Sequence, residues 1–168
     1  MDFKQAFYSG TIAGLATSLA RGVGRSAGIT SLNVELLLGS MLTQDLSPLS
    51  GAIGFALYLL IAGGIACLYA VGFAHVMQRA SWAVGLLFAL VHLGLAGLFM
   101  DALGDLHPLL VRPPLPLLDG HLLAPGLFAA NFGTTTMIGF FVLHFMYGGI
   151  IGAMYQKAPV RRLLPAVA

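Results

Sequence analysis

Residues Gly126 to Tyr155 read GLFAANFGTTTMIGFFVLHFMYGGIIGAMY. They include no Asp, Glu, Lys or Arg, and about 20 apolar residues suffice for a helix to cross the hydrocarbon core of a bilayer. His144, Gly148 and Gly152 follow one another at intervals of four, which places them on one face of a helix. We therefore predict a membrane-embedded helix whose small residues admit a neighbouring helix, with the imidazole pointing toward that neighbour.

The composition extends this prediction to the whole chain. Of its 168 residues, 58% are hydrophobic and 8% are charged, whereas a soluble domain has about a quarter charged residues. The formal net charge of +2 is small and the basic residues are scattered, which gives no support to a nucleic-acid partner. We expect the lipid bilayer to surround the protein.

The hydrophobic pattern predicts a single integral membrane domain. Four spans are expected, at about residues 6–28, 49–77, 81–100 and 126–155. Residues 31–46 are too few to cross a bilayer and carry their apolar side chains on one side, so we predict an interfacial amphipathic helix. Residues 101–125 form a leucine-rich outer loop that should lie on the membrane or beneath a partner. The predicted fold is all-α, a four-transmembrane-helix bundle with a short interfacial helix between spans one and two.

The first predicted span has a face of small residues that ends at a charge. Gly10 and Gly14 form a GxxxG pair, and Thr17 and Arg21 continue the stripe at helical spacing. We expect the three glycines that follow to break or loosen the helix. If the helix continues instead, Arg21 is more deeply buried and needs a partner.

Small residues mark the predicted helix-packing positions of every span. These positions are Gly10, Gly14, Gly63, Gly64, Gly85, Gly148 and Gly152.

The distribution of Lys and Arg predicts the orientation. Four spans place both termini on one side, and the basic residues of that side are Lys4, Arg79, Lys157, Arg161 and Arg162. The opposite side holds three arginines and five of the six acidic residues. Because cytoplasmic loops carry the excess of Lys and Arg, we predict cytoplasmic N- and C-termini.

Two motifs resemble a known group of proteins. The first span opens with G-x-I-A-G-L-A-T from Gly10 to Thr17, and the last reads N-F-G from Asn131 and L-H-x-x-Y-G-x-x-x-G from Leu143 to Gly152. Together with the order of the helices, this resembles a family of small bacterial four-helix integral membrane proteins of unknown function. The resemblance implies a location in the bacterial inner membrane and no known activity.

Two histidines are the candidate cofactor-binding residues. His92 is at the centre of the third span and His144 lies beyond the middle of the fourth, so both are near mid-depth. Facing histidines at this depth could ligate one b-type haem. The alternative is that each hydrogen-bonds across a helix interface, to a carbonyl or to a hydroxyl such as that of Thr134, Thr135 or Tyr147.

A second candidate cluster is an outer ion pair of Arg21 with Asp101 or Asp105. All three residues belong to the outer end of the bundle, so they could form a structural clamp or an anion or substrate gate. His107, Asp119 and His121 also lie on the outer side, but their spacing matches no metal-ligand motif.

The sequence contains no nucleophile–base pair, glycine-rich phosphate loop or paired membrane carboxylates, so we predict no enzymatic activity and no resident cofactor. The expected function is that of an accessory or structural subunit, packing against other membrane protein subunits or a second copy of the chain. One alternative is a haem b electron-transfer subunit using His92 and His144. Another is a small transporter or channel with a hydrated path past Thr134, Thr135 and Thr136.

Overall fold

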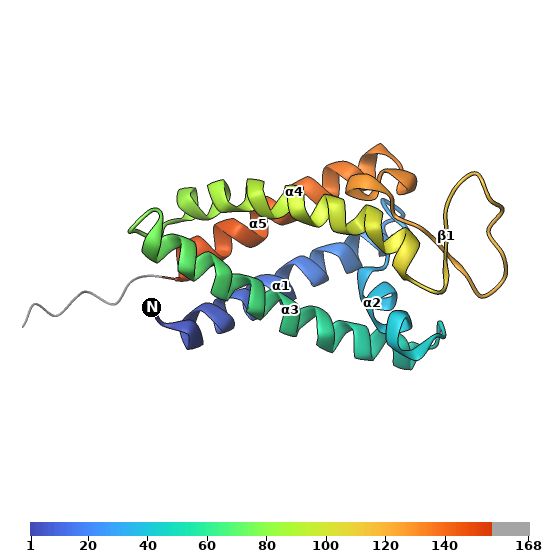
Figure 1. The fold of residues 1–168 in the computed structure, drawn as a ribbon, viewed down its shortest axis with the longest axis horizontal. Helices are drawn as coiled ribbons and strands as arrows, with labels where there is room; N and C mark the ends of the chain where they lie inside the picture. Colours follow the sequence, from blue (N-terminus) through green and yellow to red (C-terminus); the bar gives the residue numbers. More distant parts are fainter. Residues whose placement is uncertain (156–168) are drawn as a thin grey trace, which may run out of the picture.

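The computed structural model describes residues 1–155, which are mostly helical (Figure 1). In chain order the elements are α1 (Phe3–Ser26), α2 (Val34–Thr43), α3 (Pro48–His75), α4 (Trp82–Leu106), β1 (Leu110–Val111), β2 (Leu122–Leu123), the 3-10 helix η1 (Leu127–Phe132) and α5 (Thr134–Met154). The two short strands pair in parallel. Three of the described helices, α3, α4 and α5, are long and apolar enough to cross a membrane. The expectation of a mostly helical chain with membrane-compatible helices is thus confirmed, and the two short strands are an addition to the predicted all-α fold.

Polar side chains fix the first turn of four helices. The side chains of Asp2, Asn33, Ser47 and Ser81 each accept a hydrogen bond from the backbone N–H three residues later, at the starts of α1, α2, α3 and α4. These bonds satisfy amide groups that have no partner within the helix. The start of each helix is therefore encoded locally in the sequence.

The long helices form two closely packed pairs, α1 with α3 and α4 with α5 (Figure 1). In the first pair, a methyl group on Gly14 would lie 2.6 Å from the Cβ of Ala62. In the second pair, a methyl group on Gly85 would overlap the carbonyl of Gly148. Because glycine has no side chain, the backbones of the paired helices come into contact at these positions, as in other membrane helix pairs.

Two apolar cores hold the pairs together at opposite ends. One core, at the end of the bundle near the N-terminus, joins α1, α3, α4 and α5 through buried aromatic side chains that include Phe73, Tyr147 and Tyr155. The other core joins α2 to α4 and α5 through Leu37, Leu103 and further apolar residues. Between these cores the helix pairs are spread apart.

Several helix bounds differ from the prediction. Helix α1 starts at Phe3 and passes through Gly22 and Gly24, where a break or loosening was expected, and α4 continues beyond residue 100 to Leu106. The last long helix begins at Thr134 rather than near residue 126, because Gly126, Phe128, Ala129 and Gly133 have positive φ angles that interrupt an α-helix.

A short helix is present where the interfacial helix was predicted. It packs tightly on α3, since a methyl group on Gly54 would overlap the carbonyl of Glu35 and one on Gly39 that of Ser50. Glu35 itself is buried, with 6% of its surface exposed, although the pattern indicated an outward position. A location at the membrane surface stays a prediction for this helix, as does the count of four spans. The predicted cytoplasmic Lys157, Arg161 and Arg162 lie outside the described residues.

Candidate functional site

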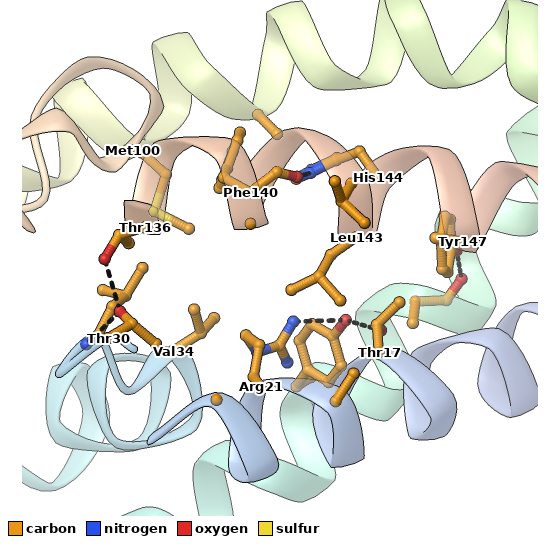
Figure 2. Close-up of a pocket in the computed structure, with 18 of the residues that line it drawn as sticks. Thr17, Arg21, Thr30, Val34, Met100, Thr136, Phe140, Leu143, His144 and Tyr147 are labelled. Atoms are coloured by element: carbon orange, nitrogen blue, oxygen red, sulfur yellow. Dashed lines mark hydrogen bonds between the residues drawn. The ribbon is translucent and has the colours of Figure 1, made fainter. Parts of the chain in front are cut away.

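A cavity of about 350 Å³ lies between the two helix pairs, where they diverge (Figure 2). Its wall is formed by α1, α3, α4 and α5, and residues of α2 and of the 27–33 connection close one end. Most of the lining side chains are apolar. The polar ones are Thr17, Arg21, Thr30, Tyr58, His92, Thr135, Thr136, His144 and Tyr147.

Exposed apolar residues border the cavity. Ile61 of α3 and Phe99 of α4 line it while 46% and 50% of their surfaces are exposed. A side chain that borders a cavity and is also exposed marks a place where the cavity reaches the outside of the bundle. Val142 of α5 and Ile29 of the 27–33 connection also line the cavity, with 58% and 53% of their surfaces exposed, so the exposed rim includes residues of several elements.

Arg21 is the charged residue of the cavity wall (Figure 2). Its Nη2 donates to Glu35 Oε1 at 2.7 Å and its Nη1 donates to the Tyr58 hydroxyl at 3.1 Å. The guanidinium carbon also lies 4.2 Å from the centre of the Tyr58 ring. The Nε–H is buried and has no hydrogen-bond partner among the side chains and backbone of residues 1–155. Of the five N–H donors of this guanidinium, two thus bond Glu35 and Tyr58.

Glu35 is the counter-ion of two arginines. Besides Arg21, it accepts from Arg25 Nη1 at 3.2 Å and from Ser18 Oγ at 2.7 Å. Burial by itself would raise the pKa of Glu35, but the charge of Arg21 and the hydrogen bonds from Ser18 and Arg21 outweigh it and hold the pKa below its ordinary value. Glu35 is therefore ionised at neutral pH, and the three charged groups sum to one positive charge.

Tyr58 and Thr17 extend the hydrogen bonds of Arg21 along α1. Thr17 Oγ1 donates to the carbonyl of Gly14 at 2.9 Å, so its contact of 2.7 Å with the Tyr58 hydroxyl is one in which Tyr58 donates. The Tyr58 hydroxyl accepts in turn from Arg21. These groups are mutually satisfied, which leaves Arg21 as the member with a spare donor.

The two predicted histidines do meet at the cavity wall. The ring centres of His92 and His144 are 4.8 Å apart, with an interplanar angle of 68°. His144 Nδ1 donates to the carbonyl of Phe140 at 2.7 Å, so the neutral ring keeps Nε2 as an acceptor. His92 Nδ1 lies 3.3 Å from the Tyr69 hydroxyl. The expected bond across a helix interface is therefore present for His92, whose partner Tyr69 is on α3, whereas His144 bonds a carbonyl of its own helix.

The observed distance between these rings does not suit a haem held between them. A metal–imidazole bond is about 2 Å long, so two axial histidines place their ring centres roughly 6 Å apart. At 4.8 Å and edge to face, the His92 and His144 rings touch each other instead. A haem-binding role stays a prediction, and it requires α4 and α5 to separate.

The predicted ion pair of Arg21 with Asp101 or Asp105 is wrong. Arg21 pairs with Glu35, while Arg112 donates to Asp101 Oδ1 at 3.1 Å and to Asp105 Oδ1 at 2.9 Å. The reason is that α4 continues to Leu106, so both aspartates project from its last turns, and the loop returns Arg112 to them. Hydrogen bonds from Arg112 to Asp105 and Asp101 raise the pKa of the guanidinium.

The outer histidines do not form a metal site with Asp119. His107 is buried against α2, where its Nε2 lies 2.9 Å from the Leu37 carbonyl. His121 lies in the loop, with its Nδ1 3.1 Å from the carbonyl of Asp119. In the part of the chain that the structure describes, no three His, Cys, Asp or Glu side chains are grouped as metal ligands.

Comparison with known protein families, curated proteins and solved structures finds no match to this chain. The resemblance to a family of small bacterial membrane proteins therefore stays a prediction. The site has to be interpreted from its own residues.

Proposed function

We propose that the protein is a four-span protein of the bacterial inner membrane with both termini in the cytoplasm. Helix α1, although less apolar than the other three long helices, packs along α3 and is 24 residues long. It therefore completes a bundle with α3, α4 and α5. The excess of Lys and Arg on the side of the termini supports the orientation. Reporter fusions at each terminus test it, and activity of an extracytoplasmic reporter at either end contradicts it.

Within that membrane, we propose that the protein holds a hydrophobic small molecule between its helix pairs and carries out no reaction of its own. The observation that carries this proposal is the cavity of about 350 Å³ with apolar walls and a few convergent polar groups. Small-molecule sites in proteins have this character, with volumes of about 300 to 1,000 Å³. The rim at Ile61 and Phe99 gives a molecule dissolved in the bilayer a route to the cavity.

The test compares two substitutions that differ only in where the new side chain points. Gly139 lines the cavity, and Gly94 does not; a methyl group at either position meets no atom within 4 Å. Gly139→Leu should fill the cavity while Gly94→Leu leaves it open. We expect hydrophobic molecules extracted from the purified native protein and from Gly94→Leu to be reduced at least about tenfold in Gly139→Leu, measured by mass spectrometry of the extract. Equal amounts in all three proteins would contradict the proposal.

A second candidate is the accessory subunit or homo-oligomer, favoured by the exposed leucines of the outer loop. Leu115, Leu117 and Leu118 have 67%, 58% and 58% of their surfaces exposed. Such a patch suits a protein partner or the membrane surface. Most of the predicted packing glycines, in contrast, contact helices of the same chain, and Gly64 is the one of them that meets nothing within 4 Å. Native mass measurement tests this candidate, and a lone species of 17.6 kDa contradicts it.

Two further alternatives stay predictions with direct tests. A Soret band in the purified protein would support haem b binding by His92 and His144. Ion flux in liposomes would support a transporter or channel. The threonines proposed to line a water path start α5, and Thr136 Oγ1 lies 3.0 Å from the carbonyl of Phe132 in the preceding turn.

A further inference from the structure

We propose that the molecule bound in the cavity is a single-chain amphiphile with a carboxylate head, a long-chain fatty acid in chemical class, and that Arg21 binds the head. This inference rests on the proposed function, since it names the ligand of the same cavity. Three properties of the site lead to it: its net charge, its unpaired donor and its size.

The charges around Arg21 are one negative group short of balance. Arg21 and Arg25 share the single carboxylate of Glu35, and the exposed fractions of the three side chains are 12%, 28% and 7%. Charges removed from water are paired in proteins, because an unpaired buried charge is strongly unfavourable. One monoanion brings this cluster to neutrality. A neutral ligand leaves the excess charge in place, and a dianion reverses it.

The position of the missing anion is set by the hydrogen bonds that are already formed. The Tyr58 hydroxyl donates to Thr17 and accepts from Arg21, so it offers the ligand little. Arg21 lines the cavity, and its Nη1 and Nη2 each have a second N–H besides the one that bonds Tyr58 or Glu35. Carboxylates are matched acceptors for a guanidinium, with short and strong charge-assisted bonds. The head of the ligand therefore belongs at Arg21.

The size of the cavity selects one acyl chain. A volume of about 350 Å³ is near the lower end for small-molecule sites, so it takes a carboxylate and the first part of a chain. The exposed apolar rim, which includes Ile61 and Phe99, lets the rest of the chain leave the cavity for the lipid. A two-chain phospholipid has its phosphate beneath a glycerol and two chains, which this space does not accommodate.

Glu35 competes with the ligand for the same guanidinium. It occupies Nη2 of Arg21 at 2.7 Å and cancels part of the positive charge. Glu35→Gln removes the competing charge but keeps the size of the side chain, so it should strengthen binding of a carboxylate. The double substitution Arg21→Gln with Glu35→Gln removes the more deeply buried pair, and the cation it leaves without a carboxylate is Arg25, whose side chain is 28% exposed to solvent.

The experiment measures displacement of radiolabelled oleate from the detergent-purified full chain at pH 8. The competitors are unlabelled oleate, oleyl alcohol and dioleoyl phosphatidic acid. We expect the native protein to bind oleate at least about tenfold more tightly than oleyl alcohol, the usual range for a charge-assisted bond. Glu35→Gln should increase this preference, and the double variant should bring it close to unity. The matched control is Arg79→Gln, the same change at an exposed position in the turn after α3, which should retain the native preference.

Each contrary outcome overturns a different statement. Equal binding of oleate and oleyl alcohol to the native protein refutes the carboxylate head, while the proposed hydrophobic-ligand function stands. Stronger displacement by phosphatidic acid than by oleate refutes the single-chain carboxylate. A tenfold preference that persists in the double variant refutes the role of Arg21. Failure of the native protein to bind any of these probes, with no hydrophobic molecule in its extract, refutes the proposed function as well.

Discussion

The same four long helices form both halves of the bundle, the half at the N-terminus and the half at α2. The cavity lies toward the half that contains α2. In the first half, Tyr147 of α5 donates to the carbonyl of Ala62 on α3, and the amide of Asp2 donates to the Tyr155 hydroxyl at 3.0 Å. Aromatic rings fill the remaining space between the pairs. Toward the other end, α2 and the Arg21 cluster occupy the space where the pairs would otherwise meet.

Small residues and charged residues are concentrated at different interfaces of the bundle. Glycines at Gly85, Gly148 and Gly152 allow backbone contact between α4 and α5. The buried ion pair of Arg21 and Glu35 joins α1 to α2, and Tyr58 joins it to α3. Arg21 of this cluster lines the cavity.

The largest effect is expected where the helices touch. Gly85→Leu places a side chain against the Gly148 carbonyl and should separate α4 from α5. We expect destabilisation by about 3 kcal/mol or more, because overpacking against a rigid backbone is poorly relieved. Thermal unfolding in detergent, followed by circular dichroism, measures it. Gly94→Leu on the same helix meets no atom within 4 Å and should change little. Equal losses in the two variants would contradict the close packing of this half.

A smaller loss is expected from Arg21→Ala in the cavity half. The substitution leaves Glu35 buried with Arg25 and Ser18 as its remaining partners. Breaking a buried pair costs about 3 to 5 kcal/mol, and the remaining partners should reduce this to about 2 kcal/mol. The same unfolding measurement checks it, and restoration of stability by adding Glu35→Gln is the expected sign of an orphaned carboxylate. A double variant no more stable than Arg21→Ala would count against the pair.

The pH dependence of stability should report on the same pair. Because the folded pKa of Glu35 is below its ordinary value of 4.5, its stabilising contribution is complete above that pH and is lost as the pH falls through the folded pKa. The melting temperature of the native protein should therefore fall more steeply below about pH 4.5 than that of Glu35→Gln. Parallel curves for the two proteins would show that Glu35 is not ionised in the folded state.

The smallest effect is expected at the outer ion pairs. Arg112, Asp101 and Asp105 have 35%, 48% and 72% of their side chains exposed, and exposed ion pairs contribute little to stability. Arg112→Ala should therefore lower the melting temperature less than Gly85→Leu or Arg21→Ala and leave the amount of extracted hydrophobic ligand unchanged. A loss of bound ligand in this variant would contradict the expectation, because it would show that the ion pairs of Arg112 affect ligand binding in the cavity.

The spacing of residues along single helices predicted the features of the structure that are set within one helix or at one contact between two helices. Glycine spacing identified the contacts at Gly85, Gly148 and Gly152, and the positions of His92 and His144 along their spans predicted that they meet. The conditional expectation for the first span is also confirmed, because α1 continues to Ser26 and Arg21 is buried with a partner.

The identity of that partner could not be obtained in the same way. It depends on how the chain turns back between α1 and α2, where Gly28 has a φ of 71° and Glu35 is brought beneath Ser18. One feature of the sequence indicates the pairing of Arg21 with Glu35, since Glu35 is the first acidic residue after Arg21. The pattern of its helix indicated an outward position, however, because amphipathic spacing does not account for a cation on the neighbouring helix. The pairing of α1 with α3 and of α4 with α5 is likewise a tertiary property.

The central claim is that an apolar chain resides between the helix pairs, and photo-crosslinking tests it most directly. A long-chain alcohol with a diazirine in its chain would be equilibrated with the detergent-solubilised protein, irradiated, and its adducts located by peptide mass spectrometry. We expect adducts on the cavity-lining residues Ile61, Phe99 and Met100, with loss of these adducts in Gly139→Leu. Adducts confined to outward-facing residues such as Leu68 and Val91, unchanged in that variant, would contradict it.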